Sequence, residues 1–386
     1  MSQVMAKKEI NTAENANFNI GRGELLKALS HVQSVVEKRG TIPILSNIKI
    51  DVVDGSIELT ATDMEIAVMD SVPADVSQVG SFTVQAHMLY EIVRKLPDDA
   101  DVSFVEDKNA QKVNIKAGSA KFSLATLPVD EFPNIGTGIL PNSFSISKDE
   151  CRILIEKTRF AMSNEETRYY LNGVYLHEAE SDGLPILRAV ATDGHRLSRA
   201  DVPLPAGAAG ITGCIIPRKT IGEIGKLLED APAEIKISTS ESKIRFEFGN
   251  TILFSKLIDG NFPDYNRVIP ANNDIILEIG TVLLAKAVDR ISVISSEKVR
   301  GVKLQMENNI VTVSNPSTDQ NQGEEKIEAN YAAEPLSVGF NSKYLGDVLG
   351  QIESDIVRFA LSNGGASLVS DPKDDSVIYV IMPMRV

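Results

Sequence analysis

The feature that most constrains the fold of this chain is an internal repeat along its 386 residues. Similar units open at Phe18, Phe144 and Leu277, which is a period of roughly 130 residues. Each opening strand leads into a segment whose apolar residues recur every three or four positions, and this spacing predicts an amphipathic helix. The apolar positions are Leu25, Leu26, Leu29, Val32, Val35 and Val36 in the first unit, Ile153, Leu154, Thr158 and Ala161 in the second, and Leu283, Leu284, Ala287, Ile291 and Ile294 in the third. Units of this length predict an array of similar domains, each with its own core.

Each unit repeats its own pattern once more, at a half-period of roughly 65 residues. Short strands with alternating apolar residues follow the first helix, and Asp54-Gly55 predicts a tight hairpin between two of them. The second halves open with strands at Ser81, Cys214 and Leu336, and a short helix is expected after each. We therefore expect an α+β fold of three tandem similar domains, each made of two β-α-β-β-β halves. The expected domains are 18–139, 140–272 and 273–386, preceded by a disordered N-terminal extension at 1–17.

The charge of the chain gives one argument against nucleic-acid binding and one in its favour. The net charge is −14, whereas a protein that grips phosphates is normally basic. The predicted helices and their edges carry about 16 Lys or Arg against about 12 Asp or Glu, so they are about +4 and the remainder is about −18. This segregation fits helices that face a polyanion, and the alternative is ordinary solvated helix faces of mixed charge. The basic residues include Lys27, Lys38, Arg39, Arg94, Lys95, Arg152, Lys157, Arg159, Arg218, Lys219, Lys226, Lys286, Arg290 and Lys343.

Several classes of protein are disfavoured by what the sequence lacks. No apolar run approaches the roughly 20 residues of a membrane helix, and the first 17 residues carry no apolar signal-peptide core. We therefore expect a cytoplasmic protein. Cys151 and Cys214 are too few for a disulfide framework and have no metal-ligand spacing, so we expect buried free thiols. We expect no metal and no cofactor, because the four histidines have no ligand spacing either.

Asp193-Gly194-His195 invites a catalytic interpretation, in which Asp193 orients His195 as a general base. No nucleophile elbow, phosphate-binding loop, Gly-rich dinucleotide motif or metal cluster accompanies it. Asp63 occupies the matching position of the first unit without a histidine, which indicates that the aspartate serves a turn. A hydrolase with its site at Asp193 and His195, and an interaction scaffold of domains strung like beads, are the two alternative hypotheses for function.

Short motifs spread in order along the chain carry the most specific information about its family. They are Thr41-Ile42-Pro43-Ile44-Leu45, Arg168-Tyr169-Tyr170-Leu171-Asn172-Gly173, Ala191-Thr192-Asp193-Gly194-His195-Arg196-Leu197, Phe262-Pro263-Asp264-Tyr265, Glu297-Lys298-Val299-Arg300-Gly301 and Met382-Pro383-Met384-Arg385-Val386. On a repeat of six halves, this set resembles the bacterial sliding clamp, the β subunit of DNA polymerase III. The resemblance spans residues 18–386.

The resemblance implies the DNA clamp fold, in which two chains close head to tail as a dimeric ring with helices inside and sheets outside. It implies a DNA polymerase processivity factor that encircles and slides on double-stranded DNA, independently of sequence, and that has no catalytic site of its own. The implied partners are the replicative polymerase, the clamp loader and other proteins with a clamp-binding motif, such as repair polymerases, ligase and mismatch-repair proteins. No membrane partner is implied.

A peptide-binding pocket between the second and third domains is implied as the shared docking site. Its positions in this chain are Leu171, Thr192, Gly194, His195, Arg196, Leu197, Pro263, Arg267, Val268, Val380, Met382, Pro383 and Met384. The apolar members suit a Leu or Phe anchor, and Gly194 permits close backbone approach. Arg196 and Arg267 are expected to cap the cleft and hold a peptide carbonyl or carboxylate. The alternative is that residues 380–384 are only a buried last strand.

The resemblance also implies DNA contacts and dimer contacts. The implied DNA-binding residues are Lys27, Arg39, Lys157, Arg168, Tyr169, Tyr170, Arg218 and Lys219. The chain departs from the family pattern at Glu165, in place of an amide next to DNA, and at His87-Met88, in place of a basic pair, which weakens the transfer of single DNA contacts. The dimer interface is expected to join Lys121 and Phe122 on an edge strand to Val293 and Ile294 of the third domain. The alternative for Phe122 is packing in its own core.

Overall fold

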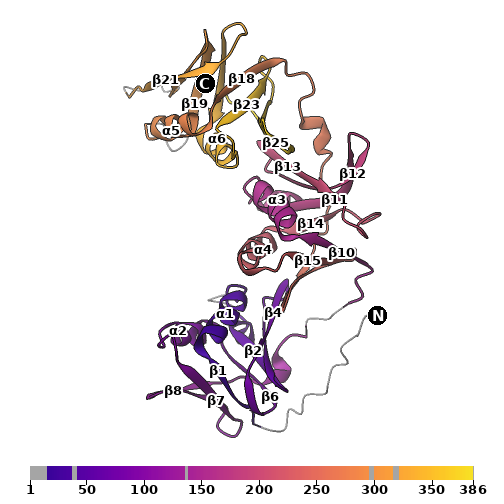
Figure 1. The fold of residues 1–386 in the computed structure, drawn as a ribbon, viewed down its shortest axis with the longest axis vertical. Coiled ribbons are helices and arrows are strands. Elements are labelled where there is room, and N and C mark those ends of the chain that lie inside the picture. The colour runs from indigo at the N-terminus through magenta and orange to yellow at the C-terminus, as the bar shows by residue number, and fades with distance from the viewer. Residues whose placement is uncertain (1–14, 37–40, 135–137, 295–299, 316–320, 386) are drawn as a thin grey trace. The chain divides into compact units, whose positions relative to one another are not determined.

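The computed structural model describes residues 15–36, 41–134, 138–294, 300–315 and 321–385. Within them the elements follow the predicted order of six successive halves, each a strand, a helix and three strands (Figure 1). One extra strand, β5 (Asp75–Gln78), follows the first half and was not predicted. The described connections also contain the 3-10 helices η1 (Pro43–Ser46), η2 (Val129–Glu131), η3 (Glu166–Leu171) and η4 (Tyr265–Val268).

The bounds of the remaining elements are as follows. The first two halves are β1 (Asn17–Gly21), α1 (Arg22–Val32), β2 (Asn47–Val53), β3 (Ser56–Thr62), β4 (Ile66–Pro73), β6 (Gly80–Gln85), α2 (Ala86–Arg94), β7 (Asp101–Asp107), β8 (Lys112–Ala117) and β9 (Ala120–Ala125). The next two are β10 (Asn142–Ser147), α3 (Lys148–Arg159), β11 (Gly173–Ser181), β12 (Leu184–Thr192), β13 (Arg196–Pro203), β14 (Cys214–Pro217), α4 (Arg218–Asp230), β15 (Glu234–Thr239), β16 (Lys243–Phe248) and β17 (Thr251–Lys256). The last two are β18 (Ile275–Gly280), α5 (Thr281–Ser292), β19 (Gly301–Glu307), β20 (Ile310–Ser314), β21 (Glu324–Asn330), β22 (Leu336–Asn341), α6 (Ser342–Leu349), β23 (Ile356–Leu361), β24 (Ser367–Asp371) and β25 (Asp374–Ile381).

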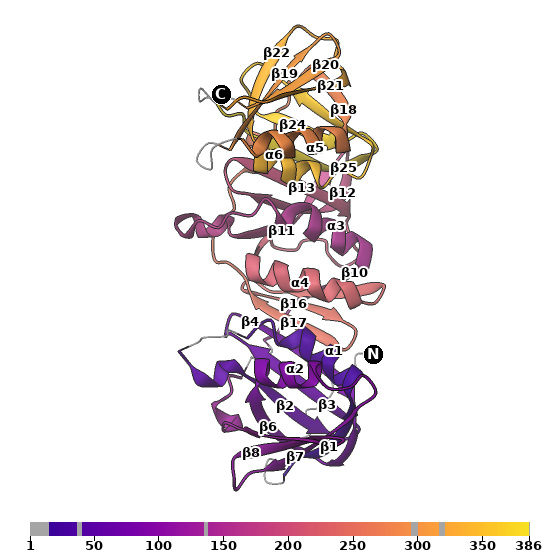
Figure 2. The same ribbon diagram turned by 90° about the vertical axis from the view of Figure 1, so that its left-hand side faces the viewer.

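The predicted turn and the predicted amphipathic helices are present, with small shifts in which helix residues are buried. Val53 pairs with Ser56 across the Asp54-Gly55 turn, where Gly55 takes a φ of +76° that glycine adopts without strain. Each predicted helix buries one apolar stripe, although Leu283 is 60% exposed and the α5 stripe runs through Leu284 instead. α1 packs beside α2, and α5 packs beside α6 (Figure 2).

The two halves of each domain exchange their opening strands. β1 pairs with β7 of the second half, and β6 pairs with β2 of the first. The same exchange joins β10 to β15 and β14 to β11, and later β18 to β23 and β22 to β19. All of these pairs are antiparallel, so each half completes the sheet of the other.

The last strand of a half is used to join one domain to the next. β4 pairs with β17, and β13 pairs with β25. Of the two other last strands, β9 ends a five-stranded sheet, and β21 pairs with β20 along its length but with β18 only at Ala329 and Asn330. In the described part of the chain, β9 and residues 324–328 of β21 are therefore the last strands that keep an open edge.

The contacts divide the chain into two compact units. The first unit comprises residues 1–148 and 222–257, and the second comprises residues 149–221 and 258–386. The β4–β17 junction belongs to the first unit and the β13–β25 junction to the second. Each unit thus has one junction between successive domains in its interior.

Candidate functional site

The residues predicted to bind a peptide gather around the β13–β25 junction of the second unit. Leu197 pairs with Val380, and the backbone N–H of Met382 donates to the carbonyl oxygen of His195 at 2.9 Å. Below this junction Leu197 and Val380 are buried together with Val190 and Tyr265. Met382, by contrast, is 45% exposed. The sequence thus places exposed apolar side chains above a buried apolar floor, so the end of the chain is more than a buried strand.

A Thr-Asp turn leads into β13 and fixes the rim of the site. The Thr192 hydroxyl donates to the carbonyl oxygen of Arg196 at 2.7 Å and accepts the N–H of Gly194 at 3.1 Å. One oxygen of the Asp193 carboxylate accepts the backbone N–H groups of His195 and Arg196. Asp193 therefore holds the turn, as the matching Asp63 had indicated.

Glycine suits position 194 for two reasons. Its φ is +88°, a region that glycine adopts most readily. A Cβ atom there would come within 2.5 Å of Nη1 of Arg168, so the absence of a side chain makes room for the Arg168 guanidinium. The group that approaches Gly194 within the chain is Arg168, and close approach of a peptide backbone stays a prediction.

Arg196 does not cap the site as predicted, and this expectation is wrong. Its side chain is 6% exposed and turns inward. The three nitrogens of its guanidinium donate to Asp193 at 3.1 Å, to Asp347 of α6 at 2.6 Å and to the carbonyl oxygen of Phe160 at 2.6 Å. The cation also lies over the rings of Phe160 and Tyr344. Arg196 therefore ties β13 to α6, and its buried guanidinium is not presented to a peptide at the surface.

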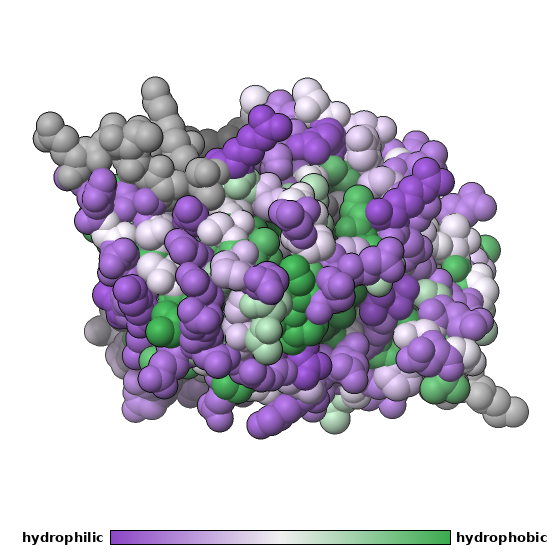
Figure 3. Space-filling model, turned by 90° about the horizontal axis from the view of Figure 1, so that it is seen from above, coloured by the Kyte–Doolittle hydropathy of each residue, from purple (hydrophilic) through white to green (hydrophobic). Residues whose placement is uncertain are grey.

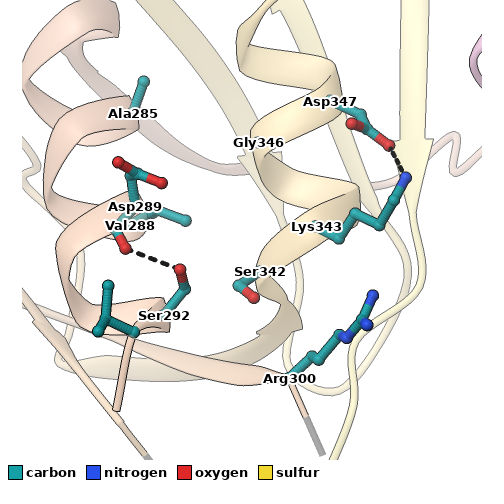
Figure 4. A pocket seen from close by; sticks show the side chains of 10 residues that line it. Ala285, Val288, Asp289, Ser292, Arg300, Ser342, Lys343, Gly346 and Asp347 are labelled. Atoms are coloured by element: carbon teal, nitrogen blue, oxygen red, sulfur yellow. Dashed lines mark hydrogen bonds and ion pairs between the residues drawn. The ribbon is translucent and has the colours of Figure 1, made fainter. Parts of the chain in front are cut away.

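Asp347 links Arg196 to a polar hollow between α5 and α6. Oδ2 of Asp347 also accepts from Lys343 at 2.9 Å, as Figure 4 shows. Burial raises the pKa of Asp347, but the hydrogen bonds from Lys343 and Arg196 outweigh it and hold the pKa below its ordinary value. The hollow has a volume of about 450 Å³, and Asp289 and Arg300 also line it. Ala285, Val288 and Val293 line the hollow as well, so its walls are of mixed polar and apolar character.

A buried polar network that sequence reasoning missed holds η4, which carries Arg267 and Val268. The Tyr265 hydroxyl lies 3.0 Å from Nε2 of His177 and accepts from Arg188 at 3.3 Å. Arg188 is itself paired with both carboxylate oxygens of Asp201, at 2.6 and 2.7 Å. The Phe262-Pro263-Asp264-Tyr265 motif was the available signal, but the partners lie on distant strands.

The other predicted peptide residues occupy different depths. Arg267, whose side chain is 83% exposed, bonds only to the neighbouring Asp264 among the contacts of the described residues and remains able to cap a ligand. Pro263 and Val268 are exposed and Leu171 is buried. Pro383 and Met384 are half-buried, and the Met384 N–H donates to the carbonyl oxygen of Gly339.

The predicted DNA contacts fall into two groups. Lys27, Tyr169 and Lys219 are exposed, and Tyr170 is half-buried. The other described members are engaged with the protein. Arg168 forms a two-pronged pair with Glu165, and Arg218 donates to the carbonyl oxygens of Met162 and Ser163. Lys157 is 15% exposed and donates to Gln351 and Glu353, which disfavours it as a phosphate ligand. Arg39 lies outside the described residues.

Charge is nevertheless segregated as expected. The six described α-helices carry 13 Lys or Arg against 10 Asp or Glu, a net charge of +3, whereas the whole chain carries −14. The rest of the chain is therefore at −17. Several helix cations pair with an acid three residues earlier, as Arg152 does with Asp149 and Arg159 with Glu156. The helix faces are thus mildly cationic.

The residues predicted for the dimer interface lie at or near open strand edges. Lys121 is exposed and Phe122 half-buried on β9, so Phe122 is not a core residue. Val293 is 81% exposed, and Ile294 reaches Gly323, next to the start of β21. Figure 3 views the molecule from above Figure 1. Hydrophilic side chains cover most of the face seen there, with hydrophobic ones in small groups.

Comparison with known proteins decides the family. The N-terminal, central and C-terminal domains of the DNA polymerase III beta subunit match residues 16–136, 145–264 and 266–385. A beta sliding clamp of Caulobacter vibrioides is 48% identical over 370 residues, which are 96% of this chain and 100% of that relative. The chain belongs to the bacterial beta sliding clamp family. A family member from Pseudomonas aeruginosa is 38% identical over 96% of this chain and 100% of its own.

Solved structures of sliding clamps have the same fold. A Caulobacter crescentus clamp with polyethylene glycol in its beta-motif tethering region has a TM-score of 0.93 at 47% identity and covers 96% of this chain and 99% of its own. A Bartonella birtlesii clamp bound to griselimycin has a TM-score of 0.93 at 42% identity and covers 97% of this chain and 100% of its own. Both likenesses extend over all six halves.

Family membership settles the class of function. Sliding clamps are processivity subunits of DNA polymerase, so the chain acts in DNA replication and has no catalytic site of its own. The hypotheses of a hydrolase and of a beads-on-a-string scaffold are therefore wrong. Cys151 and Cys214 are buried and unpaired, and burial raises the pKa of both thiols to about 12. Among the described residues, the helices are too short or too polar to cross a membrane.

Proposed function

We propose that two copies of this chain close head to tail into a ring around double-stranded DNA. The observation that carries the proposal is the use of the last strands. Four of them pair inside the chain, β4 with β17 and β13 with β25, and β9 and residues 324–328 of β21 keep open edges. Pairing β9 of one copy with β21 of the other would repeat the same junction across the two copies and use both edges.

The charges of the two edges support this pairing. β21 carries Glu324, Glu325 and Glu328 against Lys326, whereas Lys121 lies on β9 and Lys116 opposite it on β8. Opposite charges favour contact between β9 and β21, and like charges disfavour contact of either edge with its own copy. The apolar Val293 and Ile294, with Phe122, would form the water-excluding part of the interface.

The ring explains how an acidic chain stays on an acidic polymer. A closed ring is linked around the duplex, so it needs little affinity for phosphate and slides without regard to sequence. The mildly cationic helices would face the duplex, with the exposed Lys27 and Lys219 among their cations. We propose that the chain works in this way in the cytoplasm, after a clamp loader has placed it on DNA.

The β13–β25 junction is the proposed docking site for partner proteins. An extended peptide would place a Leu or Phe anchor over Leu197 and Val380, against Met382 and Val268, with Arg267 at the rim. Met382 adapts to anchors of different shape. This site would tether the replicative polymerase, the clamp loader, repair polymerases, ligase and mismatch-repair proteins in turn.

The ring is tested by placing aspartate at the two apolar residues. The Val293→Asp, Ile294→Asp double variant is expected to sediment as a monomer, because the charges would be buried at the interface. The wild type should sediment as two chains and, with loader and ATP, should stay longer on circular nicked DNA than on a linear fragment. Leu184→Asp, an exposed apolar position on β12, is the control. A persistent dimer of the double variant contradicts the interface.

The docking site is tested by deleting residues 382–386. We expect fluorescence polarisation with a Gln-Leu-type clamp-binding peptide to show loss of binding, while sedimentation still shows two chains. Met382→Asp, which keeps the backbone bond to His195, should weaken the peptide at least tenfold. Unchanged peptide affinity in both variants would place the docking site elsewhere.

A further inference from the structure

The first unit contains a second junction with the geometry of the proposed docking site. At the β4–β17 junction, Ala67 pairs with Phe254 where the second unit pairs Leu197 with Val380. The N–H of Lys256 donates to the carbonyl oxygen of Glu65 at 2.9 Å, which repeats the bond between Met382 and His195. The labels of Figure 2 show β4 and β17 at this junction.

The turn at the rim is repeated contact by contact. The Thr62 hydroxyl donates to the carbonyl oxygen of Ile66 at 2.8 Å and accepts the N–H of Met64 at 2.9 Å. One oxygen of Asp63 accepts the N–H groups of Glu65 and Ile66 at 2.9 and 2.8 Å. Met64 holds a φ of +75° where the second unit has Gly194. The backbone that frames the docking site in the second unit is therefore present in the first.

A cavity with a volume of about 260 Å³ lies at this junction. Its apolar lining includes Met64, Ile66, Ala67, Pro133 and Phe254. Ala67 and Phe254 stand where the second unit has Leu197 and Val380, and Met64 is 52% exposed. The volume is below the range of drug-sized sites, so it suits one apolar side chain of an extended segment.

The charges at the mouth differ from those of the second unit. Lys243 and Lys256 both line the cavity. Glu65 also lines it and pairs with Lys256 at 2.9 Å, while Lys256 remains about half-exposed. The residues that line the cavity therefore carry two positive charges against one negative charge, on a chain whose net charge is −14. An acidic ligand would be attracted here, whereas most of the surface repels it.

We propose that the β4–β17 junction is a second peptide-docking site, which binds an extended acidic segment by one Leu or Phe anchor. The anchor would enter between Met64 and Phe254, and a flanking carboxylate would lie against Lys243 and Lys256. A chain would then hold two different peptides, the acidic one in the first unit. The choice of a peptide as ligand rests on the proposed function of the second unit, while the cavity and its charges stand by themselves.

The experiment uses the full-length chain with its β13–β25 site blocked by Met382→Asp. The probe is fluorescein-labelled Glu-Glu-Leu-Phe-Glu, with Lys-Lys-Leu-Phe-Lys as the matched basic peptide. Two further variants act on the first unit. Lys256→Glu reverses a half-exposed charge, and Met64→Asp puts a carboxylate at the mouth, where aspartate tolerates the positive φ. Lys236→Glu, an equal charge change on β15 outside the cavity, is the control.

The blocked chain is expected to bind the acidic peptide and not the basic one. Lys256→Glu and Met64→Asp should each weaken binding at least tenfold, and Lys236→Glu less than twofold. Absence of binding to the blocked chain, or binding that neither variant changes, overturns the second site. If the wild type binds the probe and Met382→Asp removes all of it, the second site fails while the proposed function stands. If the wild-type affinity is untouched by Met382→Asp but falls with Lys256→Glu, the second site stands, and the first docking site is judged separately with the Gln-Leu-type peptide.

Discussion

Replacing Arg196 by Met removes the cation that ties β13 to α6. Methionine keeps the length and much of the packing against Phe160 and Tyr344, but the three hydrogen bonds of the guanidinium are lost. A hydrogen bond to a charged group is worth roughly 1.5–3 kcal/mol when buried. Asp193 and Asp347 are partly exposed, so water replaces part of what they lose, and about 1 kcal/mol for each bond is a fair value. The expected cost is therefore about 3 kcal/mol of unfolding free energy.

The assay is thermal and urea unfolding of the full chain, followed by peptide binding. In a unit of 150–250 residues each kcal/mol lowers Tm by roughly 2–4 °C, so a loss of roughly 6–12 °C is expected. Arg267→Met is the matched control, because that side chain is exposed and should cost less than about 0.5 kcal/mol. The peptide should also bind more weakly to Arg196→Met, since His195 and Leu197 flank the residue.

Two results would refute this account of Arg196. One is a cost below about 1 kcal/mol, which would mean that the buried bonds contribute little. The other is an equal cost for Arg196→Met in chains with Asp347 and with Asn at that position, because a double-mutant cycle must show coupling between groups 2.6 Å apart.

Two further predictions concern charge. His31 lies 2.6 Å from Asp70 and 3.3 Å from Asp230; burial lowers its pKa, but the two aspartates outweigh burial and the pKa is raised. A raised folded-state pKa stabilises the protein at pH values below the ordinary histidine pKa of about 6.5, and that stability is lost as pH rises through the folded-state pKa. Urea unfolding between pH 5.5 and 8.5 should show the loss in the wild type and not in His31→Gln. Reversing the charges of Lys27 and Lys219 together should slow clamp loading on primed DNA, measured by stopped-flow. Lys157→Glu should act mainly on stability, because Lys157 donates to Gln351 and Glu353. Equal loading rates for the wild type, the double variant and Lys157→Glu would count against helices that face DNA.

The sequence was sufficient for the order of elements because that order is encoded locally. Apolar spacing and turn residues such as Asp54-Gly55 are read within a few positions, and the repeat confirms each assignment three times. Strand β5 was not predicted because residues 75–78 are mostly polar and exposed and have no alternating apolar pattern. The exchange of opening strands was also out of reach, since β1 and β7 lie some 80 residues apart and no local pattern records their pairing.

The site was predicted as a set of residues but not as a set of roles. Thr192, Leu197, Val380 and Met382 meet at one junction, as the resemblance implied. Arg196 lies at the predicted junction, but its side chain points into the protein and not toward a peptide. The sequence could not show this because its partner Asp347 is 151 residues away. Lys157 is a similar case, with its partner Glu353 196 residues away. Whether a long cation faces solvent or the protein depends on such distant acceptors.

The exchange of opening strands has a consequence for synthesis on the ribosome. β1 cannot find its partner until residue 107 has emerged, and β4 must then wait for β17, at residues 251–256. For much of translation the nascent chain therefore exposes unpaired main chain along β4, which is a hazard for aggregation. Asp70 and Ser71 on β4, with Glu65 just before its start, place polar groups along this waiting strand. Slow growth of the chain beyond residue 148 should lengthen that vulnerable interval and increase the need for a chaperone.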